Sequence, residues 1–380
     1  MDPTTIGLGA VGVVFAINFI LMIGLVALKA IHRRRTTQHE KRRAAYLGLL
    51  SRHLAIPNHT DPIGRGVTGD SAFLDAVIDL RNTVSGPEID TLSGIVDRLG
   101  LADKQVQALN SRFPLGRRLR AAVSLAEMGD ESTARVLIEH LDDREPEIRI
   151  QAARGLGRMQ HTAAIDAILE RFAFEQPWVR TRFADTLIGF GSKATWPLVA
   201  YIRVNLQGEQ GEGVIEAIRI LGTIGDRDVG PTLASVLNVA KDPEIKIAAI
   251  DALGKVGGPM AIRPVSYLLA SGDWRLRAKA VTALGDIGDP SVNWMVAEGL
   301  DDANWWVRRN SAAALASLPG GIALLMTALE SDDLFARDAA AEALADSGEL
   351  AAARERLDEG AATESDLTLI EYVREQLVVT

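Results

Sequence analysis

The sequence contains no cysteine among its 380 residues. This absence excludes disulfide frameworks, thiolate catalysis and cysteine-rich zinc sites, and it is compatible with a reducing compartment. Aromatic residues make up only 5% of the chain, and β-branched runs bounded by hairpin turns are scarce. Because the chain is rich in alanine and leucine, we expect an all-α protein.

Sequence patterns of catalysis are also missing. The chain has no G-x-S-x-G motif and no glycine-rich loop between a strand and a helix. The histidines lack the spacing with carboxylates that a metal site requires. They are His32, His39, His53, His59, His140 and His161. We therefore expect no enzymatic activity, no metal and no cofactor.

Charge is distributed unevenly along the chain, whose net charge is -9. Residues 29–52 carry eight lysines and arginines against one acid, Glu40. From residue 53 onward there are 33 bases against 48 acids. A basic segment therefore precedes an acidic body, and the acidic body opposes the approach of a nucleic acid.

A long apolar stretch occupies residues 6–28, and these 23 residues are uncharged. A helix needs about 20 such residues to cross a bilayer. No cation precedes the stretch and no small-x-small cleavage site follows it, so it predicts a transmembrane helix rather than a cleaved signal. Because the cations begin at Lys29, we expect a single-pass protein of the cell (inner) membrane, with its N-terminus outside and its body in the cytoplasm. The basic segment then either contacts anionic headgroups or is a solvated charge run.

Three residues within this stretch are candidates for a contact with another membrane helix. Gly12 and Ala16 are small enough to let a second helix approach, and Asn18 lies near the middle of the span. The alternative is that the helix only anchors the chain.

Local composition divides the rest of the chain. Residues 55–70 concentrate Pro, Gly, Asn and Asp, which predicts a linker between a juxtamembrane helix and the folded body. Helices are expected at about 71–82, 87–99 and 102–110. The predicted organisation is a transmembrane helix (1–31), a basic juxtamembrane helix and linker (32–70), an N-terminal helical cap (71–113), repeats (114–348) and C-terminal cap helices (349–380).

From about residue 114 the sequence repeats itself. Each copy has an apolar residue, a cation, small residues, and a leucine eight positions after the apolar residue. The leucines recur at intervals of 29 to 34 residues, at Leu125, Leu156, Leu187, Leu221, Leu253, Leu284, Leu315 and Leu344. Each period holds a second amphipathic helix, such as 132–141, followed by an acidic turn. The unit is thus a helical hairpin, which must stack on its neighbours to bury its apolar face.

Residues 276–289 read LRAKAVTALGDIGD. They resemble the unit of the HEAT-repeat family, in particular the short bacterial form called PBS-lyase HEAT-like. The resemblance covers about residues 114–348 and implies a right-handed α-solenoid of about eight HEAT-like hairpins. Such solenoids serve mainly as binding scaffolds.

We therefore expect a membrane-anchored scaffold or adaptor for protein–protein interaction. Its cytosolic solenoid would dock a partner protein or the cytosolic domain of a membrane enzyme. One alternative is a bilin lyase or isomerase, because such enzymes resemble the same short unit. Another is a nucleic-acid-binding HEAT-like protein.

The family resemblance also implies which positions line the concave surface, namely the non-core positions of the second helix in each unit. Arginines at these positions could bind carboxylates of a partner, or the face could simply be solvated. The positions are Arg120, Gln151, Arg154, Arg158, Arg182, Asp185, Glu216 and Arg219, followed by Asp251, Lys255, Lys279, Thr282 and Asp286.

Two further sets recur with the repeat. The first is a ladder of cations: Arg118, Arg149, Arg180, Lys246, Arg277, Arg308 and Arg337. In the family such cations usually pair with the acid of the preceding turn, here Asp142, Asp242, Asp273, Asp302 and Asp333; a phosphate-binding ladder is the alternative.

The second set is Trp178, Trp274, Trp305 and Trp306, at the starts of second helices. We expect these tryptophans along one edge, either as packing between hairpins or as interface hot spots.

Overall fold

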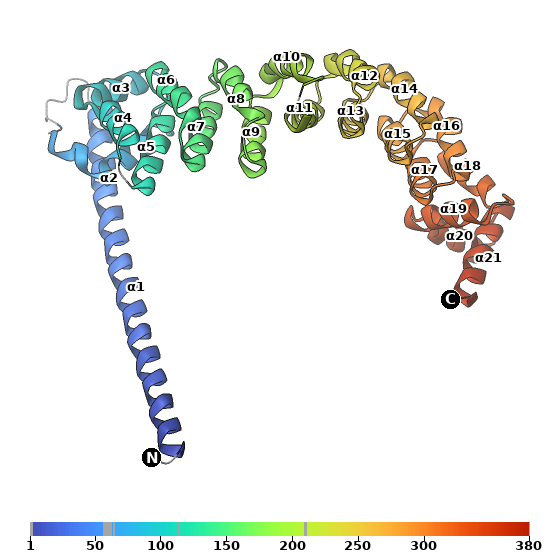
Figure 1. Cartoon of the computed structure of the whole chain (residues 1–380), viewed down its shortest axis with the longest axis horizontal. Helices are drawn as coiled ribbons and strands as arrows, with labels where there is room; N and C mark the ends of the chain where they lie inside the picture. Colours follow the sequence, from blue (N-terminus) through green and yellow to red (C-terminus); the bar gives the residue numbers. More distant parts are fainter. Residues whose placement is uncertain (1–2, 56–62, 64, 113, 209–210, 380) are drawn as a thin grey trace. The chain divides into compact units, whose positions relative to one another are not determined.

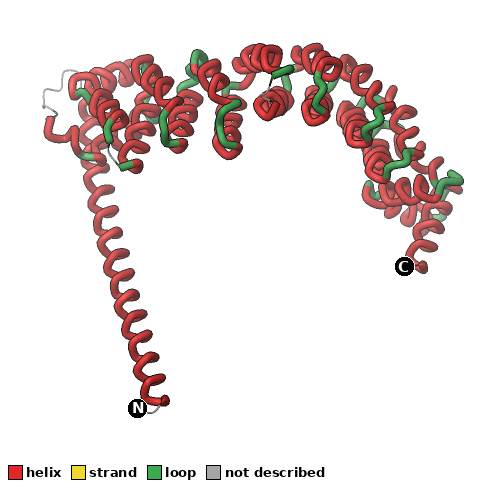
Figure 2. Tube along the Cα trace, in the orientation of Figure 1, coloured by secondary structure: helices red, strands yellow, loops and turns green. Residues whose placement is uncertain are grey.

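The computed structural model consists of α-helices and short 3-10 helices, with no strand in the part of the chain that it describes (Figure 2). That part comprises the backbone of residues 3–55, 63, 65–112, 114–208 and 211–379, with side chains except those of 3–20, 65 and 375–379. The chain divides into two units, Met1–Gly155 and Leu156–Thr380. The prediction of an all-helical fold is confirmed.

The first unit begins with a long helix and continues with shorter ones (Figure 1). Its elements are α1 (Pro3–Ala55), η1 (Arg65–Gly69), α2 (Ser71–Arg81), α3 (Pro87–Leu99), α4 (Leu101–Asn110), α5 (Leu115–Met128), α6 (Glu131–Glu139), η2 (His140–Asp142) and α7 (Pro146–Arg158), whose last residues belong to the second unit. The three helices expected between residues 71 and 110 are confirmed as α2, α3 and α4.

The end of α1 packs directly against the body of the first unit. Leu50 is fully buried, and Tyr46 lies edge to face with the buried ring of Phe73, with ring centroids 5.3 Å apart. The guanidinium of Arg43 pairs with Asp79 of α2 at 2.5 Å. The last turns of α1 thus carry an apolar face that completes the core of the first unit. Residues 56–62 and 64 of the predicted linker lie outside the described residues.

The second unit is a succession of helical hairpins. Its elements are α8 (Ala164–Phe172), α9 (Pro177–Gly189), η3 (Gly191–Ala194), α10 (Thr195–Asn205), α11 (Gly211–Ile224), η4 (Arg227–Val229), α12 (Gly230–Val239), α13 (Pro243–Val256), α14 (Pro259–Ser266), η5 (Tyr267–Ala270), α15 (Trp274–Ile287), η6 (Pro290–Val292), α16 (Asn293–Ala297), η7 (Glu298–Asp301), α17 (Trp305–Ser317), α18 (Gly321–Ala328), α19 (Leu334–Asp346), α20 (Glu349–Asp358) and α21 (Glu364–Val379).

Neighbouring hairpins of this unit pack through their second helices. Helix α13 contacts α11 and α15, and α17 contacts α15 and α19. The eight leucines that mark the repeat in the sequence are all fully buried. The stacked hairpins predicted from the period are therefore confirmed, and the leucines fill the seams between helices.

The acidic turns begin the second helices. The Asp273 carboxylate accepts a hydrogen bond from the backbone N–H of Arg275 at 2.9 Å, and Asp242 and Asp333 accept equivalent bonds from Glu244 and Phe335. An aspartate at this position satisfies an N–H group that has no partner within the helix. The turn acids are thus helix caps.

Among the residues with described side chains, no helix contains a stretch long and apolar enough to cross a membrane. Residues 6–20 of the predicted span lie outside that set, as do Gly12, Ala16 and Asn18.

Candidate functional site

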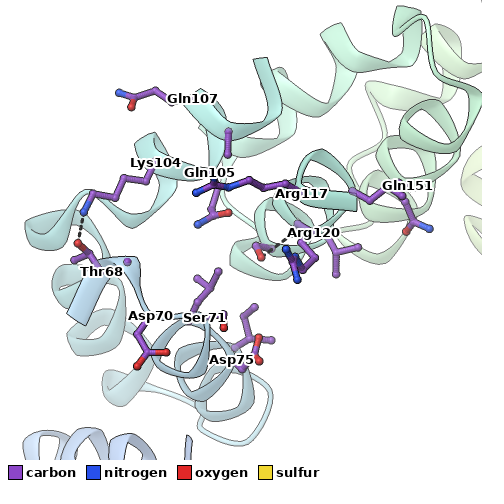
Figure 3. Close-up of a pocket in the computed structure, with 17 residues that line it drawn as sticks. Thr68, Asp70, Ser71, Asp75, Lys104, Gln105, Gln107, Arg117, Arg120 and Gln151 are labelled. Atoms are coloured by element: carbon purple, nitrogen blue, oxygen red, sulfur yellow. Dashed lines mark hydrogen bonds between the residues drawn. The ribbon is translucent and has the colours of Figure 1, made fainter. Parts of the chain in front are cut away.

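A groove of about 830 Å³ lies in the first unit, between α2, α4, α5 and α7 (Figure 3). Helix α2 contributes Asp75, α4 contributes Lys104, α5 contributes Arg120, and α7 contributes Gln151. Its volume falls within the range of about 300–1,000 Å³ that is common for ligand-binding clefts. The groove is the candidate binding site of this unit.

The α2 wall of the groove is fixed by contacts with α1. The Asp70 carboxylate accepts hydrogen bonds from Arg42 and from the Tyr46 hydroxyl, each at 3.2 Å, and it caps α2 through the N–H of Ala72 at 3.0 Å. His39 Nε2 lies 3.3 Å from the Asp75 carboxylate. Both groove acids are therefore engaged by side chains of α1.

Burial and neighbouring charges shift the pKa values of two side chains at this wall. Partial burial raises the pKa of Asp75, and the carboxylates of Asp79 and Glu40 raise it further, against the lowering effect of His39 and Arg43. Burial and the Asp70 carboxylate likewise raise the pKa of the Tyr46 phenol. Asp75 thus becomes protonated at a higher pH than an isolated aspartate would.

The opposite side of the groove is cationic. Lys104 on α4 and Arg117 and Arg120 on α5 are exposed, and the Lys104 ammonium donates to the Thr68 hydroxyl (Figure 3). The Ser124 hydroxyl, which also lines the groove, donates to the backbone carbonyl of Arg120 at 2.9 Å. The groove therefore combines acids that contact α1 on one wall with cations on the other.

Of the concave-face residues predicted from the sequence, Arg120 and Gln151 meet in this groove. Arg154 is exposed on α7 but does not line it, and Arg158 falls in the second unit. Sequence reasoning missed Lys104 and Arg117. Arg117 directly precedes the ladder cation Arg118, whereas Lys104 lies in the cap, where no repeat assigns it a position.

Two predicted arginines of the second unit, Arg182 and Arg219, pair within their own helices. Arg182 lies 3.5 Å from Asp185, and Arg219 lies 3.3 Å from Glu216. Further along, Lys279 pairs with Asp251 at 3.1 Å. Because acids alternate with bases on this face, it does not form the basic wall that the arginines alone suggest.

Two ladder cations, Arg277 and Arg118, bind an aspartate in the turn that follows their helix. Arg277 donates to the backbone carbonyl of Ser271 in the preceding turn at 2.8 Å and to both carboxylate oxygens of Asp302 in the following turn, at 2.7 and 2.8 Å. Arg118 pairs in the same way with Asp143, and both partners are buried. The predicted partner of Arg277, Asp273, instead caps α15 and accepts from the Arg275 side chain. Arg308 does contact Asp302 of its preceding turn, through the backbone carbonyl at 2.7 Å.

The four tryptophans begin their helices but do not all lie together. Trp305 and Trp306 are in contact, with ring centroids 4.6 Å apart, and Trp274 begins the neighbouring helix α15. Trp178 begins α9, which α11 and α13 separate from α15 in the stack. Trp178, Trp305 and Trp306 are nearly half exposed, so their rings extend beyond the packing between hairpins.

No cluster of three or more histidine, aspartate or glutamate side chains suited to a metal occurs within the described portion of the molecule.

The family model of HEAT repeats matches residues 102–188, 206–271 and 262–321, which together make up more than half of the sequence. The chain belongs to the HEAT-repeat family. No curated protein matches the sequence at a significant level.

Solved structures resemble this HEAT-repeat chain at low sequence identity. A Kap121p mutant is 13% identical with a TM-score of 0.50, over 86% of this chain and 43% of its own. Human deoxyhypusine hydroxylase is 21% identical with a TM-score of 0.30, over 70% of this chain and 99% of its own. The chain thus spans less than half of Kap121p, and the likeness to Kap121p concerns the fold.

Proposed function

We propose that this HEAT-repeat protein is a membrane-anchored scaffold without catalytic activity of its own. Its first helix tethers the chain to the cell (inner) membrane with the N-terminus outside. Its cytosolic repeats dock a partner protein or the cytosolic domain of a membrane enzyme.

The exposed apolar side chains of α1 support the anchor. Leu21, Leu25 and Leu28 are each 59–67% exposed, and the large apolar residues between them are exposed as well. Successive residues of a helix are 100° apart, so these side chains cover every face rather than one stripe. Transfer of each such side chain out of water is favourable by about 1.5–3 kcal/mol, and a bilayer provides that transfer.

The junction between α1 and the body supports a rigid tether. The helix is unbroken from Leu28 to His39, where contacts with α2 begin. Those eleven residues rise roughly 16 Å, and a headgroup layer accounts for about 5–8 Å of that distance. The proposal therefore places the first unit close to the membrane surface at a fixed height.

The observation that carries the docking role is the exposure of Trp and Arg on a rigid stack of hairpins. Trp305 and Trp306 are both 48% exposed, and the Arg309 guanidinium lies 5.4 Å from the Trp305 ring centroid. Tryptophan and arginine are the residues most enriched at hot spots of protein interfaces. The repeats thus present side chains suited to protein contacts.

The anchor is tested by alkaline extraction of membranes that contain the full chain. The proposal predicts that the chain stays in the membrane pellet and that the double variant Ile17→Asp/Leu21→Asp is released, since each aspartate at mid-span opposes insertion by about 2.5–3.5 kcal/mol. The matched control, Val204→Asp/Met260→Asp, adds the same charge at exposed apolar positions of the repeats and should stay in the pellet. Extraction of the unmodified chain would contradict the anchor.

The docking role is tested by purifying the full chain from detergent-solubilised membranes. We expect a stoichiometric partner protein, which is lost from a Trp305→Asp/Trp306→Asp variant and retained by the Val204→Asp/Met260→Asp control. If the unmodified chain is recovered without any partner protein, even after cross-linking, the proposed docking role is refuted.

A further inference from the structure

We infer that the groove between α2, α4, α5 and α7 binds an extended acidic segment of the docked protein. This inference rests on the proposed function and specifies the chemistry of one docking site.

Charge complementarity is the first reason. The lining brings Lys104, Arg117 and Arg120 together, while its two acids, Asp70 and Asp75, are held by α1. No carboxylate in the described part of the chain forms an ion pair with Arg120. A guanidinium can donate two parallel hydrogen bonds to a carboxylate, which makes Arg120 the expected contact for an aspartate or glutamate of the partner.

The amide side chains are the second reason, and they favour a peptide over a phosphate. Gln105, Gln107 and Gln151 line the groove (Figure 3). A carboxamide offers both donors and an acceptor, so it can pair with the N–H and C=O groups of an extended backbone. A fully ionised phosphate group has only acceptors to offer, so the glutamine oxygens would receive no hydrogen bond from it. The glutamines therefore match a polypeptide.

The third reason is an apolar patch beside the cations. Leu74 and Ile78 of α2 and Val123 of α5 line the same groove, and Val123 is exposed. Burial of apolar surface contributes about 25 cal/mol per Å², so this patch can hold one aliphatic side chain of the bound segment. We expect a ligand in which acidic and aliphatic residues alternate, because neighbouring side chains of an extended peptide point to opposite sides.

The experiment uses the full chain in detergent micelles and a random decapeptide library. Peptides retained by the chain are sequenced, and their dissociation constants are measured by fluorescence anisotropy. We expect enrichment of aspartate and glutamate next to aliphatic residues. Binding should weaken at least about tenfold in Arg120→Ala, because a charge-assisted hydrogen bond is worth about 1.5–3 kcal/mol. It should also weaken as salt is raised.

Matched controls separate the groove from general charge. Arg135 is an exposed arginine of α6 in the same unit, outside the groove, and Arg135→Ala should bind the selected peptides with unchanged affinity. Peptides with glutamine in place of each glutamate should bind at least about tenfold more weakly. Equal losses in Arg120→Ala and Arg135→Ala, or selected peptides without acidic enrichment, would overturn the inference.

A lipid headgroup is the competing occupant, since the α2 wall adjoins α1. Vesicles of anionic and of zwitterionic lipid are therefore added to the peptide titration. The inference predicts that neither displaces the peptide. Displacement by anionic vesicles alone would assign the groove to lipid. The peptide titration requires neither the native partner nor the membrane. If no peptide binds, the proposed scaffold is not contradicted. If no partner protein co-purifies, the peptide affinity can still be measured.

Discussion

Replacement of Gly285 by alanine tests how closely the hairpins approach each other. A Cβ atom at Gly285 in α15 would lie 2.8 Å from the Cβ and 3.1 Å from the Cα of Ala314 in α17. Carbon atoms in good contact lie about 3.5–4.0 Å apart, so the two helices would have to separate by several tenths of an ångström. The same close approach recurs between Gly222 and Ala252 and between Gly254 and Ala283. Glycine after the repeat leucine therefore sets the distance between hairpins.

The expected magnitude follows from two opposed effects. Overpacking of a tight contact typically lowers the free energy of unfolding by about 1–3 kcal/mol, whereas alanine in place of a helical glycine raises it by about 0.8–1.0 kcal/mol. Gly94 in α3 provides the matched control, because a Cβ there meets no atom within 4 Å. Gly94→Ala should be stabilising, and the two variants should differ by about 1–3 kcal/mol.

The assay must resolve local stability, because long repeat arrays do not unfold in one cooperative step. Hydrogen–deuterium exchange of the α15 and α17 amides reports the local opening free energy, and urea unfolding followed by circular dichroism reports the global one. We expect faster exchange in α15 and α17 of Gly285→Ala and unchanged exchange there in Gly94→Ala. Equal stabilisation by both substitutions would refute the close-packing argument.

Two further predictions concern ion pairs and the α1 junction. Arg277→Met removes both hydrogen bonds to Asp302 and should lower the free energy of unfolding by about 1.5–3 kcal/mol. The control Arg354→Met, at an exposed position, should change it by less than about 0.5 kcal/mol. Hydrogen bonding by Arg277 lowers the pKa of Asp302, so this stabilisation is complete above the unfolded pKa of about 3.9 and is lost as pH falls through the folded value. In urea unfolding between pH 6 and pH 3, the free energy of unfolding should therefore fall less with acid in Arg277→Met than in the unmodified chain. An equal fall in both would contradict this assignment. Phe73→Ala empties a site that is 0% exposed and in contact with Tyr46; we expect a loss of about 3–5 kcal/mol and faster amide exchange in the last turns of α1, and protection of those turns equal to that of the unmodified chain would show that α1 does not depend on this core.

The repeat could be predicted because each hairpin buries its apolar face against its neighbours in the same way. A leucine every 29 to 34 residues marks a buried seam, and the eight leucines are all buried. An aspartate directly before three of the second helices marks a cap, at Asp242, Asp273 and Asp333. Local propensity and period determine both features, so one sequence was enough to locate them.

The contacts between non-repeating elements were not predictable in this way. The ion pair of Arg43 with Asp79 joins residues 36 positions apart, and no period relates α1 to α2. Basic residues that look like a solvated run in the sequence are therefore partly engaged by the body. The groove depends on the same contacts, and only its repeat-derived members, Arg120 and Gln151, could be chosen beforehand.

The most direct test of the account is photo-crosslinking in native membranes from a benzoylphenylalanine at Gln107, which is exposed in the groove. The same reporter at Arg98, exposed on α3 outside the groove, serves as the control. If the groove docks an acidic segment of a partner protein, a discrete protein adduct should form in the membrane fraction from position 107 only. Mass spectrometry should map the crosslink to an acidic segment of that protein. An adduct of equal yield from both positions, crosslinks to lipid alone, or no adduct from position 107 would contradict it.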